Sequence, residues 1–398
     1  MNREDFPMLK QDVIYFDNSA TSLKPNSVIN KTSEYYKDFS VSIHRGDYDL
    51  SYKVNIMYEE VRLLVANFIN AKDKSEIIFT NGTTESLNMI ANGFVKNHLL
   101  KDDEILITVS EHASNVLPWF RLERKMGVKV KFIPLDDDYH VTVDNFKKMI
   151  TPRTKCVALA HITNVIGDLR PIKEICKIAK ENNIITVIDG AQSASHLKVD
   201  VQDIDCDFYA FSAHKCYGPT GVGVLYGKEE LLDKLEAINL GGGMNESFDS
   251  PTDIYLKSLP LRLEAGTPNI AGVIGFGEAI KYINNIGMDK ITSYERDLRN
   301  YLYSKLKDIS HIDILNKKSE SSILTFNVKD IFPQDVAFYL NKYNICIRAG
   351  NHCAKLLKEA TNVSNTLRIS LSFYNTKEEI DLLVDLLKDK NKIRNEML

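Results

Sequence analysis

Two polar clusters in the middle of the chain each follow an apolar segment, and together they contain an acid and a lysine. Asp189-Gly-Ala-Gln192 follows Ile184–Ile188, and Ser212-Ala-His214-Lys215 follows Phe208–Phe211. Both runs are typical of buried strands, whose carboxyl ends meet at the sheet edge where open α/β folds bind ligands. Pyridoxal phosphate requires a lysine that bonds to its aldehyde and an acid that keeps its ring nitrogen protonated. Either residue taken singly also fits an ordinary solvated charge, so the prediction depends on the pair.

A phosphate group needs backbone donors, hydroxyls and a helix N-terminus. Asn81-Gly-Thr83-Thr84-Glu85 follows the apolar run Glu76–Thr80 and precedes the helical pattern Ser86–Asn97. The amides of this segment and the Thr84 hydroxyl would therefore point at an anion. The same segment also fits a helix cap with a glutamate in the first turn. Both roles can hold together.

Six cysteines are scattered along the chain, without Cys-x-x-Cys pairs. With no export signal, this pattern favours reduced thiols over a disulfide framework or a zinc ribbon, and no metal site is expected. Cys353 differs from the others because it ends the small-residue loop Arg348-Ala-Gly-Asn-His-Cys353. Arg348 and His352 are close enough in sequence to favour the reactive thiolate form of Cys353.

Composition is that of an ordinary globular protein, with 398 residues, 44% hydrophobic and 26% charged. The net charge is −4, and basic and acidic residues are mixed along the chain. The sequence therefore has no basic cluster of the kind that binds nucleic acids. The N-terminus lacks an apolar signal core, and no run reaches the length of a membrane span. A cytoplasmic protein without nucleic-acid or membrane partners is therefore expected.

Apolar runs of strand length alternate with helical patterns in the first two thirds of the chain, which predicts a mostly parallel seven-stranded sheet with helices on both faces. After Gly266 the pattern changes to long helices and short strands, typical of a smaller α+β unit. We predict an N-terminal segment (1–20) packed on the small unit, a large cofactor domain (21–270) and a small domain (271–398) that carries Cys353. The site should lie in the cleft between the two domains. The expected strands of the large domain are 76–80, 104–110, 129–135, 155–160, 184–188, 207–211 and 222–226.

An ordered set of motifs covers nearly the whole chain and resembles the SufS-type cysteine desulfurases, a group of class V aminotransferases with the fold type I of pyridoxal phosphate enzymes. The motifs are Asp17-Asn-Ser-Ala-Thr21, His44-Arg-Gly46, Thr80-Asn-Gly-Thr-Thr-Glu85, Glu111-His112, Asp189-Gly-Ala-Gln192, His214-Lys-Cys-Tyr-Gly-Pro-Thr-Gly221, Glu264-Ala-Gly-Thr-Pro-Asn269 and Arg348-Ala-Gly-Asn-His-Cys353.

The resemblance implies a role for each matching residue of the cofactor site. Lys215 would bond to pyridoxal 5'-phosphate, Asp189 would pair with the ring nitrogen and Gln192 with the phenolate oxygen. His112 would stack on the ring and handle protons, and a pKa near neutrality would suit that work. Phosphate contacts would come from Thr83, Thr84, Ser212 and His214, and from Thr267 of a neighbouring subunit, which makes the active unit a homodimer.

The substrate implied by the resemblance is L-cysteine, with Arg368, Asn164 and Arg348 as its binding residues. A guanidinium fork suits a carboxylate because two parallel hydrogen bonds fix its orientation. Cys353 would take the sulfur as a persulfide and leave L-alanine, and the sulfur would serve iron–sulfur cluster assembly. A selenocysteine lyase or a cysteine sulfinate desulfinase, for which Cys353 would be dispensable, is the nearest alternative. A catalytically silent scaffold is a more distant one.

The sulfur acceptor is expected to be a separate protein, SufE-like or other, because only fourteen residues separate Cys353 from Arg368 and the chain lacks the extended loop of IscS-type relatives. Two positions depart from the family pattern. Asn351 stands where many relatives have histidine, so proton handling beside the nucleophile would differ. Gln334 stands where relatives that use a zinc-containing SufU-type acceptor have histidine, and glutamine is a poor zinc ligand, which argues against such a partner.

Overall fold

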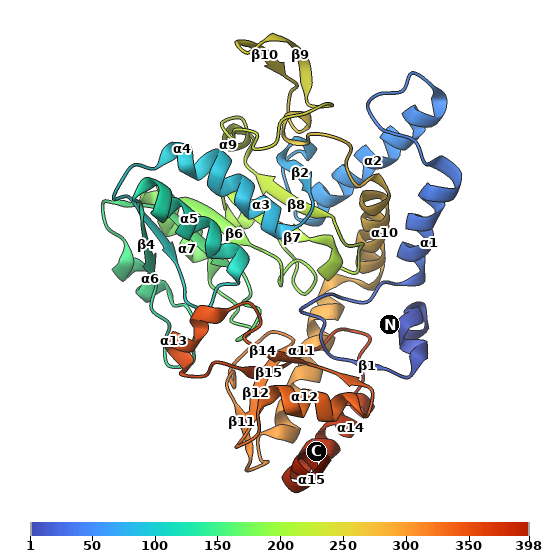
Figure 1. The fold of residues 1–398 in the computed structure, drawn as a ribbon, viewed down its shortest axis with the longest axis vertical. Helices are drawn as coiled ribbons and strands as arrows, with labels where there is room; N and C mark the ends of the chain where they lie inside the picture. Colours follow the sequence, from blue (N-terminus) through green and yellow to red (C-terminus); the bar gives the residue numbers. More distant parts are fainter. Residues whose placement is uncertain (1, 397–398) are drawn as a thin grey trace.

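A seven-stranded sheet forms the centre of the computed structural model, which describes residues 2–396 (Figure 1). All neighbouring strands are parallel except for the pairs that β8 makes with β2 and β7. The predicted mostly parallel sheet of fold type I is therefore confirmed. The strand order is β2 (Ile77–Thr80), β8 (Gly223–Gly227), β7 (Phe208–Ser212), β6 (Ile185–Asp189), β5 (Thr154–Ala160), β3 (Glu104–Ile107) and β4 (Lys129–Phe132).

Both faces of this sheet are buried, because successive strand residues belong to two different hydrophobic clusters. Leu159 and Tyr209 pack with helices on one face, whereas Ala158 and Phe208 pack with helices on the other. This alternation explains why the strands read as continuous apolar runs. The first face is covered by α1 (Asn26–Glu34), α2 (Asp49–Phe68), α6 (Val143–Met149), α7 (Ile172–Glu181), α8 (Val201–Ile204) and α10 (Ile270–Ile286); the second by α3 (Thr83–Met89), α5 (Leu117–Met126) and α9 (Glu229–Leu232).

The ends of four strands meet at one edge of the sheet. Asp189 and Ser212 are the last residues of the parallel neighbours β6 and β7, and Ser212 lies opposite Gly223, the first residue of β8. Thr80, the last residue of β2, lies opposite the same glycine. The residues that follow these strands are therefore brought to the same place.

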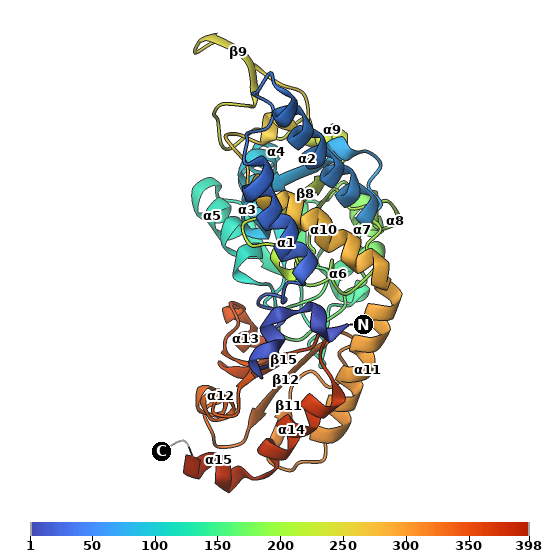
Figure 2. The same cartoon turned by 90° about the vertical axis from the view of Figure 1, so that its right-hand side faces the viewer.

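A second, four-stranded sheet lies toward the other end of the molecule (Figures 1 and 2). Its antiparallel strands run in the order β11 (Ile312–Ile314), β12 (Ile323–Val328), β15 (Thr366–Ser370) and β14 (Arg348–Gly350). It packs with α11 (Met288–Leu306), α12 (Pro333–Asn341) and α14 (Lys377–Lys388) in a third hydrophobic cluster. Arg348 and Arg368 are paired across β14 and β15, which sets the two guanidinium groups side by side on this sheet.

The N-terminal segment crosses to the second sheet. Its strand β1 (Ile14–Tyr15) pairs with β13 (Ile345–Cys346), and the Phe16 carbonyl accepts a hydrogen bond from the Ser370 amide. The helix α10 packs against α1 and α2, which favours assigning it to the larger unit. The domain boundaries at residues 20 and 270 stay a prediction. The remaining helices are α4 (Lys96–His98), α13 (Lys358–Thr361) and α15 (Lys390–Glu396).

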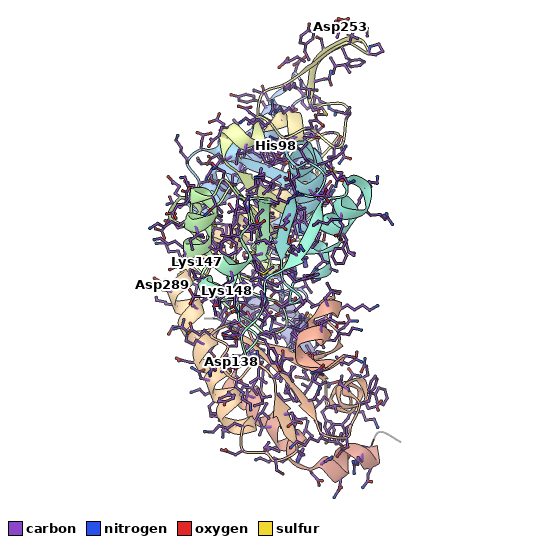
Figure 3. All side chains as sticks on the ribbon, turned by 90° about the vertical axis from the view of Figure 1, so that its left-hand side faces the viewer. His98, Asp138, Lys147, Lys148, Asp253 and Asp289 are labelled. Carbon is purple, nitrogen blue, oxygen red and sulfur yellow. The ribbon has the colours of Figure 1, made fainter. Side chains whose placement is uncertain are left out.

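Several elements were not predicted from the sequence, among them α2 and a β-hairpin. The twenty-residue helix α2 buries Val54, Tyr58, Val61 and Val65, whose spacing of three to four residues is a helical signal that could have found it. The hairpin of β9 (Asn245–Ser250) and β10 (Asp253–Leu256) projects from the molecule with most of its residues exposed, and Figure 3 shows Asp253 at its tip. No alternation of apolar and polar residues marks its strands, because neither face is buried.

No helix within residues 2–396 has the length and apolar character needed to cross a bilayer.

Candidate active site

A cavity of about 220 Å³ opens at the sheet edge where the polar clusters meet, and residues of both sheets line it. The predicted site residues that line it are Thr83, Thr84, His112, Asn164, Asp189, Gln192, Ser212, His214, Lys215, Arg348, Cys353 and Arg368. Of the predicted set, Thr267 is the one that lies elsewhere. Ser19, Ala20 and Ser114 also line the cavity and were not predicted individually.

Asp189 is buried and Lys215 is half-buried in this cavity, where desolvation shifts their pKa values in opposite directions. Desolvation lowers the pKa of Lys215 to about 8, against the opposing attraction of Asp189. Desolvation raises the pKa of Asp189 to about 6, while a hydrogen bond from the Ala191 amide to its Oδ1 (2.9 Å) works the other way. At neutral pH the carboxylate is charged, and an appreciable fraction of the lysine is the neutral, nucleophilic amine.

His112 is held in one tautomer by the turn that follows it. The Ser114 amide donates to Nδ1 (3.1 Å), so the neutral ring carries its proton on Nε2. Burial, followed by the charges of Lys215 and Arg348, lowers the pKa of His112 to about 4. The expectation of a near-neutral pKa is therefore wrong: the ring is a neutral hydrogen-bond donor at Nε2, since desolvation and neighbouring cations disfavour imidazolium.

Hydroxyl groups gather at the start of α3. The Thr83 amide donates to Ser212 Oγ (2.8 Å), the Thr83 and Ser212 hydroxyls are 2.7 Å apart, and Thr84 Oγ1 lies 2.8 Å from Ser114 Oγ. The β8 strand approaches this turn so closely that a Cβ on Gly223 would lie 2.4 Å from Gly82 Cα. Glycine at position 223 therefore permits the contact that places the hydroxyls together.

Arg368 is almost fully buried, and two of its nitrogens are already bonded. Nη1 donates to the Asn164 carbonyl (2.9 Å), and Nη2 donates to Asp17 Oδ1 (2.7 Å), while Nε is buried without a partner. Asp17 belongs to the N-terminal segment, whereas Arg368 lies on a sheet whose first strand begins some three hundred residues later. The sequence motif contained Asp17, but no spacing signal linked it to Arg368.

Cys353 is exposed at the cavity, whereas four of the other five cysteines are buried. Arg348 Nη2 lies 4.0 Å from Cys353 Sγ. The ring of His352 instead bonds Thr366 through Nε2, and burial lowers its pKa to about 3. The expectation that His352 assists the thiolate by charge is therefore wrong, because its imidazole is neutral, and Arg348 supplies the nearby positive charge.

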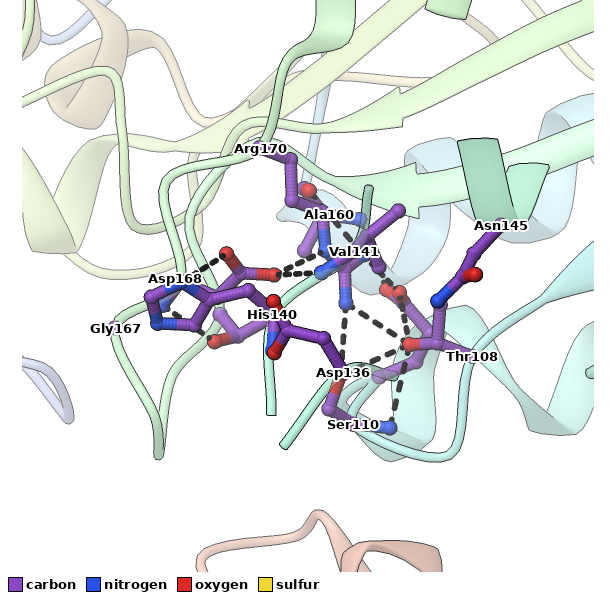
Figure 4. A network of polar contacts seen from close by, with 12 residues as sticks. Thr108, Ser110, Asp136, His140, Val141, Asn145, Ala160, Gly167, Asp168 and Arg170 are labelled. Carbon is purple, nitrogen blue, oxygen red and sulfur yellow. Dashed lines mark hydrogen bonds and ion pairs between the residues drawn. The ribbon is translucent and has the colours of Figure 1, made fainter. Parts of the chain in front are cut away.

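Arg170 is the centre of a buried polar network that sequence analysis did not predict (Figure 4). Arg170 and Glu111 form a fully buried ion pair, and Arg170 Nε lies 3.2 Å from Asp168 Oδ2. Arg170 Nη2 also donates to Thr108 Oγ1 (2.9 Å) and Ser110 Oγ (2.8 Å). Since these groups span the end of β3 and the loop after β5, the network fixes the backbone that carries His112.

Thr267 lines a separate cavity of about 130 Å³, together with Glu264 and Asn81. The loop that carries Thr267 is anchored by Arg62, whose Nη1 and Nη2 bond the two oxygens of Glu264 at 2.6 and 2.9 Å. Such a bidentate pair holds a loop in one orientation. The contact of Thr267 with a neighbouring subunit stays a prediction.

The cavity residues fit pyridoxal phosphate by the chemistry of their donor set. The cavity contains a partly neutral lysine, an ionised, buried carboxylate, a cluster of hydroxyls, an α3 amide and His214. These are the partners that an aldehyde, a ring nitrogen and a phosphate require. No group of three or more metal-ligating side chains occurs within residues 2–396.

The fold and the site are those of a pyridoxal phosphate enzyme of fold type I, and comparison with known proteins identifies the family. Residues 14–383 match the family described as aminotransferase class-V, so the chain belongs to that family. It is 43% identical over 392 residues to a probable cysteine desulfurase of Staphylococcus aureus strain Mu50, covering 97% of this chain and 95% of that protein. A probable cysteine desulfurase of Halalkalibacterium halodurans is 41% identical over 383 residues, covering 95% and 94%.

Among solved structures, the cysteine desulfurase CsdA from Escherichia coli, described as an S-sulfonic acid form, superimposes with a TM-score of 0.93 at 36% identity. The match covers 100% of this chain and 98% of that one. Within the class-V family, the chain therefore belongs to the cysteine desulfurases.

Proposed function

We propose that the protein is a pyridoxal-phosphate-dependent cysteine desulfurase that converts L-cysteine to L-alanine and holds the sulfur as a persulfide on Cys353. One observation carries the proposal. A single cavity holds a half-buried lysine with a lowered pKa, a buried carboxylate, a buried guanidinium and an exposed thiol. The chemistry requires all four groups within reach of one amino acid.

Arg368 binds the substrate carboxylate through the Nη hydrogens that Asp17 and Asn164 leave free. Lys215 and Asp189 would hold the cofactor, and the neutral His112, which lines the same cavity, keeps its proton on Nε2. Pyridoxal phosphate, when bound, withdraws electrons from the carbon atom next to the substrate amino group. Lys215, as the free amine, moves the proton at that carbon.

Cys353 then attacks the substrate sulfur. The new sulfur–sulfur bond forms on Cys353 as the carbon–sulfur bond breaks, and the electron pair of the broken bond stays with the carbon fragment, which takes up protons to become alanine. Arg348, 4.0 Å from Sγ, stabilises the thiolate before the attack.

The finer assignment is a SufS-type enzyme of the cytoplasm that delivers sulfur to an acceptor protein, SufE-like or other, for iron–sulfur cluster assembly. The open position of Cys353 supports delivery to a protein that docks at the cavity mouth. A homodimer is supported by apolar side chains exposed on the hairpin and on α2, including Phe248 (68% exposed) and Tyr255 (62%) of the hairpin and Tyr52 (69%) of α2.

The test is to incubate the purified protein with L-cysteine and measure alanine and protein-bound persulfide together. Cys353→Ala should lose persulfide and reduce alanine production by orders of magnitude, because the four buried cysteines and the half-buried Cys346 cannot replace an exposed nucleophile. Cys346→Ala serves as the matched control and should stay within about twofold of wild type.

Wild-type alanine production by Cys353→Ala would contradict the desulfurase mechanism. Selenocysteine and cysteine sulfinate should be supplied in parallel, because their leaving groups depart without a protein thiol. Activity of Cys353→Ala with these substrates and loss with L-cysteine is the pattern expected of the proposed enzyme. Equal activity of wild type and variant with all three substrates would identify a lyase or desulfinase.

A further inference from the structure

The peptide that carries Cys353 has an unusual backbone conformation. His352 and Cys353 have φ angles of 51° and 59°, so two successive residues with side chains are left-handed. Steric contact between Cβ and the backbone makes this region unfavourable for residues other than glycine, and runs of two are uncommon. Neighbouring groups must therefore hold the loop in this shape.

Three hydrogen bonds do so. Asn164 Nδ2 donates to the His352 carbonyl (2.7 Å), and the Ala113 amide donates to the Cys353 carbonyl (2.7 Å). Both donors belong to the loops of the large sheet, so they fix where the peptide lies. The third bond runs from the Cys353 amide to Asn351 Oδ1 (3.1 Å) and is made within the loop itself.

The Asn351 contact differs from the other two because it acts on the amide of the reactive residue. An asparagine whose side chain accepts from the amide two residues later forms an Asx turn, which replaces a backbone turn. The Asn351 carbonyl also accepts from the Ala354 amide (2.8 Å). Asn351 therefore accepts hydrogen bonds from the amide of Cys353 and from the amide of the residue after it. Its side chain is otherwise exposed.

We propose that Asn351 is a positioning residue that aims the thiol of Cys353 into the cavity. This inference rests on the proposed role of Cys353 as the sulfur acceptor. Without Oδ1, the Cys353 amide bonds to water and one of the three hydrogen bonds that hold the residue at positive φ is lost, which lets Sγ turn away from Arg348 and from the substrate sulfur more often. Asn351 therefore acts on sulfur transfer and leaves the earlier proton step unaffected.

The test separates these two steps in the holoenzyme. Exchange of the α hydrogen of L-alanine with solvent deuterium needs Lys215, the cofactor and Arg368, but it does not need a thiol. Persulfide formation from L-cysteine in a single turnover needs Cys353 as well. Asn351→Ala should slow persulfide formation about fivefold, the factor that corresponds to one neutral hydrogen bond, with alanine exchange within about twofold of wild type.

Two further variants complete the test. Asn351→Asp keeps an oxygen that accepts from the same amide and should restore persulfide formation to within about twofold of wild type. Asn341→Ala removes an exposed asparagine of α12 whose side chain makes no hydrogen bond within the described part of the chain, and it should change neither rate. Thermal unfolding of every variant confirms the native fold.

An unchanged persulfide rate in Asn351→Ala would overturn the positioning role while leaving the proposed function intact. A parallel fall of both rates would also overturn it, because that pattern indicates general damage to the site. A wild-type protein that exchanges alanine but forms no persulfide on Cys353 would instead overturn the proposed function, and the positioning role with it.

Discussion

Burial shifts the pKa values of the two charged groups that follow β6 and β7 in opposite directions. It lowers the pKa of Lys215 toward neutrality and raises that of Asp189 without neutralising it at pH 7. The same physical cause thus prepares one group as a nucleophile and keeps the other as a counter-charge. Neither effect follows from residue type, because both depend on the removal of water.

The lowered pKa of Lys215 predicts how cofactor attachment depends on pH. The neutral amine is the reactive form, so at pH 7 about one lysine in ten is reactive when the pKa is about 8, compared with about three in ten thousand for an ordinary lysine. The rate at which the apoprotein bonds pyridoxal phosphate should rise about tenfold per pH unit below pH 8 and level off above it. Stopped-flow absorbance measures this rate. A rise that continues to pH 10 would contradict the lowered pKa.

The charge of Asp189 can be tested separately from cofactor binding. Asp189→Asn should retain bound cofactor, since Lys215 and the hydroxyl cluster are unchanged, but it should lose most activity because an amide cannot keep the ring nitrogen protonated. Cofactor content by absorbance and alanine release report the two properties. Near-normal alanine release by this variant would remove Asp189 from its assigned role.

Among the secondary-structure elements, β8 and the turn before α3 shape the part of the cavity that contains the hydroxyl cluster. The cluster depends on how closely β8 approaches that turn. A methyl group on Gly223 would lie 2.4 Å from Gly82 Cα, within backbone that cannot move aside cheaply. Gly223→Ala should therefore displace the Thr83–Ser212 contact and weaken binding of pyridoxal phosphate about tenfold or more, with a loss of stability of about 1–3 kcal/mol.

Gly241→Ala is the matched control, because a Cβ there would have only Ala265 nearby, at 3.9 Å. Titration of the apoproteins with the cofactor, together with thermal unfolding, compares the two variants. Equal cofactor affinity in both would show that the close approach of β8 has no part in shaping the site.

At the scale of the whole molecule, the position of Thr267 outside the main cavity suggests a test of the proposed dimer. Lys215→Ala and Thr267→Ala should each have low activity as homodimers. If Thr267 completes the site of the partner subunit, a mixed dimer contains one site with both residues intact. Differently tagged subunits, co-expressed and purified through both tags, should regain about half of the wild-type activity.

If the mixed dimer is no more active than the two homodimeric variants, Thr267 acts in the site of its own subunit or in no site. Mixed dimers of Lys215→Ala with Asp189→Asn provide the control. Both of these residues line the same cavity of one chain, so the Lys215→Ala subunit keeps no reactive lysine and the other keeps no acid. That pair should not recover activity.

The seven-stranded sheet could be predicted from the sequence, because strands buried on both faces leave long apolar runs with polar residues after each run. The sequence also predicted which side chains gather at the carboxyl edge, since parallel strands end on the same side. Asp189, Ser212 and Lys215 could therefore be placed together before any coordinates. The ordered motifs added the identity of the family.

The protonation states of these groups and the contacts between distant segments depend on the tertiary fold and could not be predicted from local sequence. Asp17 meets Arg368 across 351 positions of the chain, and Arg170 reaches Glu111 from another loop, so no local spacing encodes either pair. The neutral rings of His112 and His352 result from desolvation, which exists only once the chain has closed around them. Two of the three hydrogen bonds that hold the left-handed turn at Cys353 come from Asn164 and Ala113 in loops of the large sheet, and the shape of this turn is therefore a property of the folded molecule.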